Sequence, residues 1–372
     1  MSEQPARPEP IPLTLLTGFL GAGKTTLLNR LLKDPALAGT VVLVNEFGEI
    51  GLDHLFVEGI EDGMILLASG CLCCTIRDDL IVTLEDLLRR LDNGRIAPFR
   101  RLVIETTGLA DPAPILNVLI NHPYLALRYE LDGVVTLVDA VNGMATLDTH
   151  PEALRQVVAA DRLVLTKADI ATDSQAVTAL RKRLGELNPG IAILPPDAPA
   201  EAIIGAGLYD IAARPDELRR WLATEALDDH HHDHGETHDH HHRGGHGHHH
   251  HHDVNRHDAS IRAFTLTAET PIREATFDLF WTLLRSTHGA RLLRLKGLVA
   301  LAEHPEGPLL VHAVQQILHP PVLLPTWPDA DRRSRLVLIV RDLEEETVAR
   351  LWSAFLGRPA PAQAEAHHHH HG

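Results

Sequence analysis

All three cysteines of this chain of 372 residues lie within four consecutive positions, as Cys71, Cys73 and Cys74 of the sequence GCLCC. Thiolates bind Zn²⁺ and similar soft or borderline metal ions, and a helix predicted directly downstream would lower the thiol pKa and favour the thiolate. Three sulfurs cannot complete a relaxed set of four ligands, so they favour an open site that exchanges its metal, with the last ligand from elsewhere. Two alternatives remain: a redox pair, from the C-x-x-C spacing of Cys71 and Cys74, and buried cysteines without chemistry.

A second chemical motif lies near the N-terminus, where residues 18–25 read GFLGAGKT and match the pattern G-x-x-x-x-G-K-[ST]. An apolar run precedes this motif and a helical pattern follows it. The glycines let backbone N–H groups wrap around a phosphate, the lysine reaches the β- and γ-phosphates, and the threonine hydroxyl contacts Mg²⁺. The predicted nucleotide contacts are Gly18, Gly21, Ala22, Gly23, Lys24, Thr25 and Thr26.

An acidic residue at the end of a neighbouring strand should complete a nucleotide–magnesium site. Glu105 follows the apolar run of residues 102–104, in the sequence RLVIETTG. We expect its carboxylate beside Mg²⁺ or a magnesium-bound water. Gly108 follows three residues later, and its N–H can face the γ-phosphate, the position that senses hydrolysis in nucleotide switches. The alternative for Glu105 is a solvated strand end.

The sequence LTKAD, residues 165–169, predicts the element that recognises the base. The carboxylate of Asp169 can accept two hydrogen bonds from guanine, which adenine cannot offer, and Lys167 can lie along the base plane. Thr166 stands where the familiar N-K-x-D pattern of GTPases has asparagine.

The elements that must position these residues form an alternating pattern of short apolar strands and helices. Strands are predicted over residues 13–16, 41–44, 64–67, 102–104, 133–138 and 163–165, and helices over 24–32 and 75–91. This pattern indicates an α/β P-loop nucleotide-binding domain with a mainly parallel sheet and helices on both faces. Strand-to-helix loops of such a sheet open on its carboxyl edge, so the thiols and the phosphate loop should share one face.

The chain contains 27 histidines, and their distribution divides it into parts. Residues 1–10 form a polar tail, 11–226 the P-loop domain, and 227–258 a histidine-rich segment that is predicted to be disordered. Residues 259–356 are predicted to form a small α+β domain, and 357–372 a tail whose run His367–His371 is compatible with a purification-tag remnant. Neutral imidazoles bind transition metals, so the segment is expected to bind metal weakly, exchange it fast and serve as a reservoir. The run that illustrates this consists of His248, His249, His250, His251 and His252. The alternative is a merely solvating linker.

Within the small domain, strands are predicted over residues 261–266, 291–295, 298–303, 309–314 and 335–340, and helices over 272–286 and 343–355. The isolated histidines, among them His304, His312 and His319, are expected to be ordinary surface or core residues.

The net charge of −16 argues against nucleic acid or an anionic membrane as the main partner, because both require basic patches. The first ten residues contain no apolar segment typical of a secretory signal, and no long apolar run predicts a membrane span. The reducing cytoplasm is the simplest location for three clustered thiols.

Together these stretches resemble the CobW-like P-loop GTPases. The resemblance rests on GFLGAGKTT, VNEFGEIGLD, GCLCC, ETTGLADP, LVDA and LTKAD in this order, and on RLLRLKGLVAL and VHAVQQILHPP for the family's C-terminal domain. It implies GTP hydrolysis coupled to binding and handing over a divalent transition metal, most often Zn²⁺, with Co²⁺ in members of the cobalamin pathway. It also implies that Cys71, Cys73 and Cys74 are metal ligands.

The same resemblance implies that residues 45–53 are a nucleotide-responsive switch. Glu46 and Glu49 are then candidates for contacts to magnesium-bound water or for further metal ligands, and a solvated turn is the alternative. Some relatives carry a glutamate where this chain has Val44.

The leading hypothesis is a cytoplasmic GTPase that uses GTP and Mg²⁺ and delivers Zn²⁺ (or Co²⁺) to a client metalloprotein. The alternatives are a cobalt-handling GTPase, a nucleotide-regulated metal buffer or sensor, and a kinase acting on a small metabolite. The leading hypothesis is compatible with an oligomer.

Overall fold

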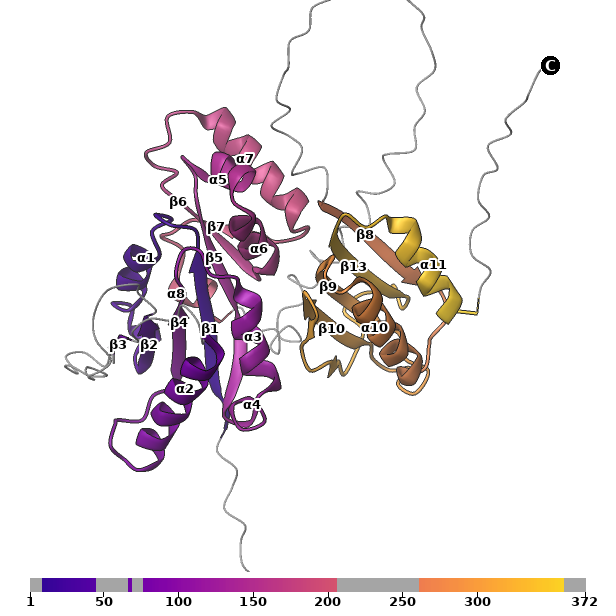
Figure 1. Ribbon diagram of the computed structural model, residues 1–372, viewed down its shortest axis with the longest axis horizontal. Helices are drawn as coiled ribbons and strands as arrows, with labels where there is room; N and C mark the ends of the chain where they lie inside the picture. The colour runs from indigo at the N-terminus through magenta and orange to yellow at the C-terminus, as the bar shows by residue number, and fades with distance from the viewer. Residues whose placement is uncertain (1–8, 45–65, 69–75, 206–260, 358–372) are drawn as a thin grey trace, which may run out of the picture.

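The computed structural model describes residues 9–44, 66–68, 76–205 and 261–357 (Figure 1). The predictions made for other residues lie outside this part of the chain, and they concern the tails, the switch at 45–53, the three cysteines and the histidine-rich segment. Among the described residues, no helix combines the length and apolar character needed to cross a membrane.

The first domain is built on a seven-stranded sheet with the order β3-β2-β4-β1-β5-β6-β7, in which every pairing is parallel. The strands are β1 (Ile11–Gly18), β2 (Thr40–Val44), β3 (Leu66–Ala68), β4 (Arg101–Glu105), β5 (Tyr129–Asp139), β6 (Arg162–Thr166) and β7 (Ala192–Leu194). Their near-continuous apolar sequences suit strands that are covered on both faces. The predicted α/β fold is confirmed.

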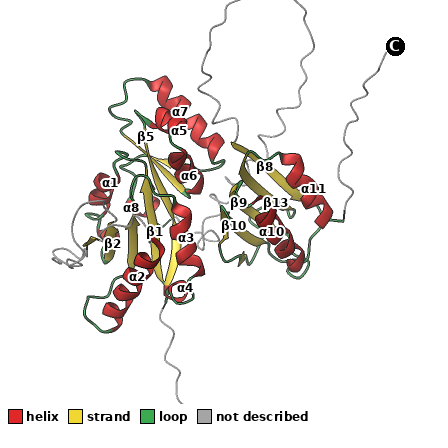
Figure 2. Cartoon of the chain, in the orientation of Figure 1, coloured by secondary structure: helices red, strands yellow, loops and turns green. Residues whose placement is uncertain are grey.

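Helices cover both faces of this sheet (Figure 2). They are α1 (Lys24–Leu31), α2 (Ile76–Asp92), α3 (Pro112–Asn121), α4 (Leu125–Arg128), α5 (Gly143–Thr149), α6 (Pro151–Ala159), α7 (Ser174–Leu187) and α8 (Ala200–Ile203), with a 3₁₀ turn at Pro35–Leu37. Because side chains alternate along a strand, Leu13 and Leu15 pack with α2 and α3, whereas Leu16 packs with α1 and α8 on the opposite face.

The second domain is an antiparallel sheet with the order β11-β10-β9-β13-β8, and β12 also pairs with β10. Its elements are β8 (Ile261–Ala268), α10 (Glu274–His288), β9 (Leu292–Val299), β10 (Leu309–Val314), β11 (Ile317–Leu318), β12 (Val322–Leu323), β13 (Ser334–Arg341) and α11 (Glu345–Phe355). The helices cover one face with Phe277, Phe280 and Trp352 in the core, and the other face turns toward the first domain. The predicted small α+β domain is therefore present.

One prediction in this domain is wrong. Residues 291–295 and 298–303 were expected to form two strands, but β9 runs unbroken from Leu292 to Val299. Gly297 does not mark a turn there. A Cβ atom at this position would lie 2.0 Å from the carbonyl oxygen of Arg335 on β13, so glycine allows the close approach of two paired strands.

A buried group of charges joins the two domains. Arg294 of β9 donates hydrogen bonds to the carbonyl oxygens of Val158 and Ala160 and to the carboxylate of Asp161, all at the C-terminal end of α6. Lys296 lies 3.5 Å from the same carboxylate. Burial alone would raise the pKa of Asp161, but the charges of Arg294 and Lys296 outweigh it and hold the pKa below its ordinary value.

Two buried histidines lie against this group. The rings of His312 and His319 are 4.3 Å apart between centroids, and neither ring forms a hydrogen bond through its nitrogen atoms. Burial lowers the pKa of both, that of His319 to about 4, because a charged imidazole would lose its hydration and face Arg294 and Lys296. Both are core residues, in agreement with the prediction.

These histidines should make the protein sensitive to mild acid. The unfolded chain protonates His319 near the ordinary histidine pKa of 6.5, whereas the folded chain does so only near pH 4. The free energy of unfolding therefore falls as the pH drops from 6.5 to 4, by about 3 kcal/mol for this group. We expect His319→Leu to flatten the dependence of the melting temperature on pH in this range. The same change at the partly exposed His304 should leave that dependence as it is, and an equal slope in all three proteins would contradict the prediction.

Candidate nucleotide-binding site

The phosphate loop connects β1 to α1, and its glycines occupy conformations that other residues rarely adopt. Gly18, Gly21 and Gly23 have φ angles of 145°, 75° and 90°. At Gly18 a Cβ atom would lie only 2.6 Å from the carbonyl oxygen of Leu137 on β5, so the loop starts where two strands run close together. Gly23 precedes the first turn of α1, and the helix N-terminus offers its partial positive charge at the loop.

Lys24 lies across the mouth of this loop. Its Nζ donates hydrogen bonds to the carbonyl oxygens of Gly18, at 2.8 Å, and Phe19, at 3.4 Å. Partial burial lowers the pKa of Lys24, and the nearby carboxylate of Glu105 opposes that shift. A lysine ammonium at this position can neutralise phosphate oxygens.

Thr25 and Glu105 meet as the sequence predicts. The hydroxyl of Thr25 donates to Glu105 Oε1 over 3.2 Å, from the start of α1 to the end of β4. Glu105 is only 5% exposed although it ends its strand, so it is not a solvated strand end. A hydroxyl and a carboxylate at this distance are hard oxygen donors, which is the chemistry that Mg²⁺ prefers. These two residues therefore fit a magnesium ion.

The end of β6 contacts the phosphate loop from the other side. The hydroxyl of Thr166 is 2.8 Å from the carbonyl oxygen of Ala22 and 3.2 Å from that of Val138. Threonine in place of asparagine thus ties β6 to both the loop and β5. Lys167 follows with a φ angle of 59°, and Asp169 is exposed. An exposed carboxylate here is accessible to a base.

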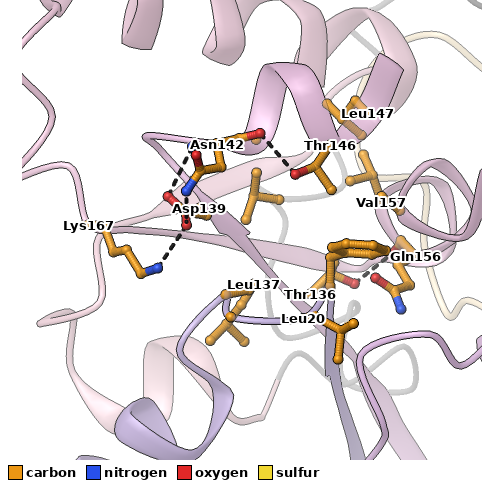
Figure 3. Close-up of a pocket in the computed structure, with 16 residues that line it drawn as sticks. Leu20, Thr136, Leu137, Asp139, Asn142, Thr146, Leu147, Gln156, Val157 and Lys167 are labelled. Atoms are coloured by element: carbon orange, nitrogen blue, oxygen red, sulfur yellow. Dashed lines mark hydrogen bonds and ion pairs between the residues drawn. The ribbon is translucent and has the colours of Figure 1, made fainter. Parts of the chain in front are cut away.

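Asp139, at the end of β5, is a site residue that we did not single out from the sequence. Its carboxylate lies 2.8 Å from Lys167 Nζ and 3.1 Å from the side-chain nitrogen of Asn142 (Figure 3). Burial would raise the pKa of Asp139, but hydrogen bonds from Lys167, Asn142 and two backbone N–H groups hold it below its ordinary value. Its signal in the sequence was an acidic residue directly after an apolar strand, the same signal that identified Glu105.

A cavity of about 240 Å³ lies beside the loop, between Phe19–Ala22, the end of β5 and the helices α5 and α6 (Figure 3). Gln156 of α6 lines it. The Gln156 side chain donates to the carbonyl oxygens of Gly108 and Ala110, at 3.1 and 3.0 Å. Gly108 packs directly on the loop, because a Cβ atom there would lie 2.6 Å from the Leu20 nitrogen. No sequence pattern marks Gln156, which carries the single side-chain amide of α6.

The structure therefore brings together Gly18, Ala22, Lys24, Thr25, Glu105, Gly108 and Thr166, with Lys167 and Asp169 at the next strand end. The predicted metal ligands Cys71, Cys73 and Cys74, the switch residues Glu46 and Glu49, and His248–His252 lie outside the described residues. Within the ranges that the structure covers, no three His, Cys, Asp or Glu side chains gather as metal ligands would.

A parallel sheet with a glycine-rich loop between its central strand and a helix, and a Thr–Glu pair beside that loop, defines a P-loop nucleotide-binding protein. Comparisons with known proteins identify the family. Residues 12–195 match the CobW/HypB/UreG nucleotide-binding domain, and residues 261–356 match the C-terminal domain of cobalamin synthesis protein CobW. The chain belongs to this family, as its sequence resemblance implied.

Two relatives are informative. The zinc chaperone YjiA of Escherichia coli (strain K12) is 45% identical over 179 residues, which cover 48% of this chain and 55% of YjiA. The zinc chaperone CobW of a Sinorhizobium species is 34% identical over 258 residues, covering 60% of this chain and 70% of that protein. The match to the first relative thus spans little more than half of its length.

A solved structure also resembles the whole fold. The crystal structure of Zn(II)-bound YjiA GTPase from E. coli superposes with a TM-score of 0.66 at 28% identity, and the match covers 93% of this chain and 99% of that one.

Thr166 provides a test of the site. Its replacement by valine keeps the shape but leaves the Ala22 carbonyl without its hydroxyl partner. We expect Thr166→Val to weaken nucleotide binding roughly tenfold, because a lost buried hydrogen bond costs about 1–2 kcal/mol. GDP and GTP should be affected equally, since the hydroxyl supports the loop itself. Thr166→Ser retains the hydroxyl and should bind almost normally. Fluorescent-nucleotide titration measures all three, and wild-type affinity in the valine variant would contradict this role.

Proposed function

We propose that this protein hydrolyses GTP and uses the nucleotide cycle to bind a divalent transition metal, most often Zn²⁺, and to deliver it to a client metalloprotein in the reducing cytoplasm. The observation that carries the GTPase part is the contact between Thr25 and Glu105 beside the phosphate loop. It joins a helix start and a strand end that are far apart in the sequence, and it forms the donor pair that a nucleotide–magnesium complex requires.

Catalysis at this site is mainly a matter of position and charge. The loop amides and the Lys24 amine can neutralise phosphate oxygens. Thr25 and Glu105 would hold Mg²⁺, which would supply positive charge beside the phosphates. Gly108 packs against the loop at Leu20, and from this position its N–H would face the γ-phosphate. A nucleoside triphosphate and a diphosphate therefore differ in what they offer to residues 106–111.

The preference for guanine is assigned to Asp169 and Lys167. The Asp169 carboxylate can accept hydrogen bonds from both N1–H and the 2-amino group of guanine. Lys167 is restrained by Asp139 at 2.8 Å, which holds its aliphatic stem in place beside a bound base.

The metal part of the proposal rests on Cys71, Cys73 and Cys74 and on the family, whose relatives YjiA and CobW are named zinc chaperones. The strand register supports a location near the nucleotide. Ala68, the last residue of β3, pairs with Val44, which in turn pairs with Glu105. Strand β3 thus ends level with Glu105, three residues before Cys71 in the sequence.

Recognition of the guanine base can be tested by replacing the Asp169 carboxylate, which accepts hydrogen bonds, with an amide that can donate them. Asp169→Asn should lower GTP affinity about 100-fold or more, because two hydrogen bonds to a charged group are lost. The same variant should gain affinity for xanthosine triphosphate, whose C2 carbonyl accepts from the asparagine amide. Asp278→Asn, at an exposed position of α10, is the matched control. Nucleotide competition assays measure the exchange, and an unchanged preference in Asp169→Asn would assign guanine recognition elsewhere.

Metal binding should depend on the nucleotide. We expect Zn²⁺ to bind more tightly with a non-hydrolysable GTP analogue than with GDP, and the analogue to bind more tightly with Zn²⁺ by the same factor, because linkage is reciprocal. Cys73→Ala should remove this nucleotide-dependent metal site and leave the weak metal sites of the histidine-rich segment. Competitive chelator titrations with Zn²⁺, Co²⁺, Ni²⁺ and Fe²⁺ provide the measurement.

Survival of the nucleotide-dependent site in Cys73→Ala would show that its ligands are other residues. Tight metal binding without multiple-turnover GTP hydrolysis, or without transfer to an apo-client, would instead support a metal buffer.

A further inference from the structure

Residues 106–111 lie between the nucleotide site and the second domain, and both sides hold them. At the start of this segment, the Thr106 N–H donates to the Leu16 carbonyl over 2.9 Å, and its hydroxyl donates to the Thr17 hydroxyl over 2.8 Å. In the middle, Gly108 packs on the phosphate loop at Leu20. At the end, Asp111 accepts a hydrogen bond from the Ala113 N–H and caps α3.

Helix α6 holds the middle of the segment from outside. The amide nitrogen of Gln156, in a side chain that is 1% exposed, donates to the Gly108 and Ala110 carbonyls. The position of Gln156 is itself maintained by the Thr136 hydroxyl, 2.8 Å from its backbone carbonyl (Figure 3). At the N-terminal end of α6, the His150 ring stacks on Phe19 of the phosphate loop, with 4.4 Å between centroids. A shift of α6 therefore moves the backbone that faces the nucleotide.

The second domain holds the C-terminal end of this same helix. Arg294 donates to the Val158 and Ala160 carbonyls, which carry the partial negative charge of a helix end, and to Asp161. Its guanidinium is buried, so the contact is sheltered from solvent and from salt.

A second contact from the same domain reaches the segment directly. The side-chain nitrogen of Gln315 lies 3.2 Å from each carboxylate oxygen of Asp111. Gln315 is in the two-residue turn between β10 and β11, where its φ angle is 52°. Glycine or asparagine is the usual residue in this left-handed conformation, so glutamine occupies it at a conformational cost. The turn itself does not favour glutamine, so the contact of its side chain with Asp111 is the reason for this residue.

We propose that the second domain is a positioning element for residues 106–111, which acts through Gln315 on Asp111 and through Arg294 on α6 and its Gln156. This inference rests on the proposed GTPase function, in which the Gly108 N–H would face the γ-phosphate. A nucleotide with a γ-phosphate and a docked second domain then stabilise the same arrangement of the segment. By linkage, each strengthens the other by the same factor.

The proposal predicts a selective effect of Gln315 on GTP. Gln315→Ala should weaken binding of a non-hydrolysable GTP analogue about three- to tenfold, as expected for a lost hydrogen bond to a partly exposed carboxylate, and should lower kcat. GDP affinity should stay at the wild-type value, because GDP has no group that faces Gly108. Gln315→Glu, which places a second carboxylate beside Asp111, should have the larger effect, and Gln316→Ala, an exposed neighbour in the same turn, should have none.

Two further measurements separate positioning from a general structural defect. In an Asp111→Ser background, which keeps a helix-capping residue but removes the carboxylate, Gln315→Ala should have no additional effect on analogue binding. In the wild type, the analogue but not GDP should slow hydrogen–deuterium exchange of residues 309–323, and this protection should be lost in Gln315→Ala.

The outcomes are distinct. Equal loss of GDP and analogue affinity in Gln315→Ala, or an unchanged ratio of the two, overturns this inference and leaves GTP hydrolysis standing. A wild-type protein that binds neither nucleotide overturns the proposed function, and the inference with it.

Discussion

The parallel register of β1 and β4 determines the chemistry of this molecule. Leu16 pairs with Glu105, so the phosphate loop and the acidic strand end leave the sheet at the same level, and Thr25 can reach the carboxylate. On the other side, Gly18 pairs with Leu137 of β5 and tolerates no side chain. A slip of one residue in either pairing would separate the hydroxyl from the carboxylate or force a Cβ atom into a backbone. Core packing on both faces of the sheet maintains this register.

Helix α6 connects the phosphate loop, at the carboxyl edge of the sheet, to the second domain. It is only nine residues long, so its two ends move together with little opportunity to bend. One end lies on the phosphate loop through Phe19, and the other is clamped by Arg294. The intervening Gln156 holds the backbone of Gly108. The C-terminal domain is thus packed against the nucleotide site's own framework.

The sequence predicted the parts of the site that depend on local patterns. Neighbouring residues in the sequence are enough to identify a glycine-rich loop after an apolar strand. The same holds for Glu105 and the sequence TKAD at strand ends, and the structure places all three at the carboxyl edge of the sheet. The interface between the two domains could not be predicted in this way. Arg294 and Lys296 alternate with leucines as in a strand with one solvated face, so the pattern predicts exposure, whereas the first domain buries both. The partners of Gln156 and Gln315 are set by tertiary contacts that no local pattern contains. The predicted gap between the strands at 291–295 and 298–303 was wrong because the role of Gly297, close approach to the Arg335 backbone, depends on another strand.

The pair formed by Asp161 and Arg294 also bears on how the protein is assembled, because its members are 133 positions apart. During synthesis, Asp161 is made before Arg294, and at that stage its carboxylate can accept from the Val134 N–H of its own domain but lacks its cation. When the second domain arrives, its cations bury this carboxylate. A misplaced docking would bury one charge without the other, which costs several kcal/mol. Only a docking that brings Arg294 and Lys296 to Asp161 avoids this cost.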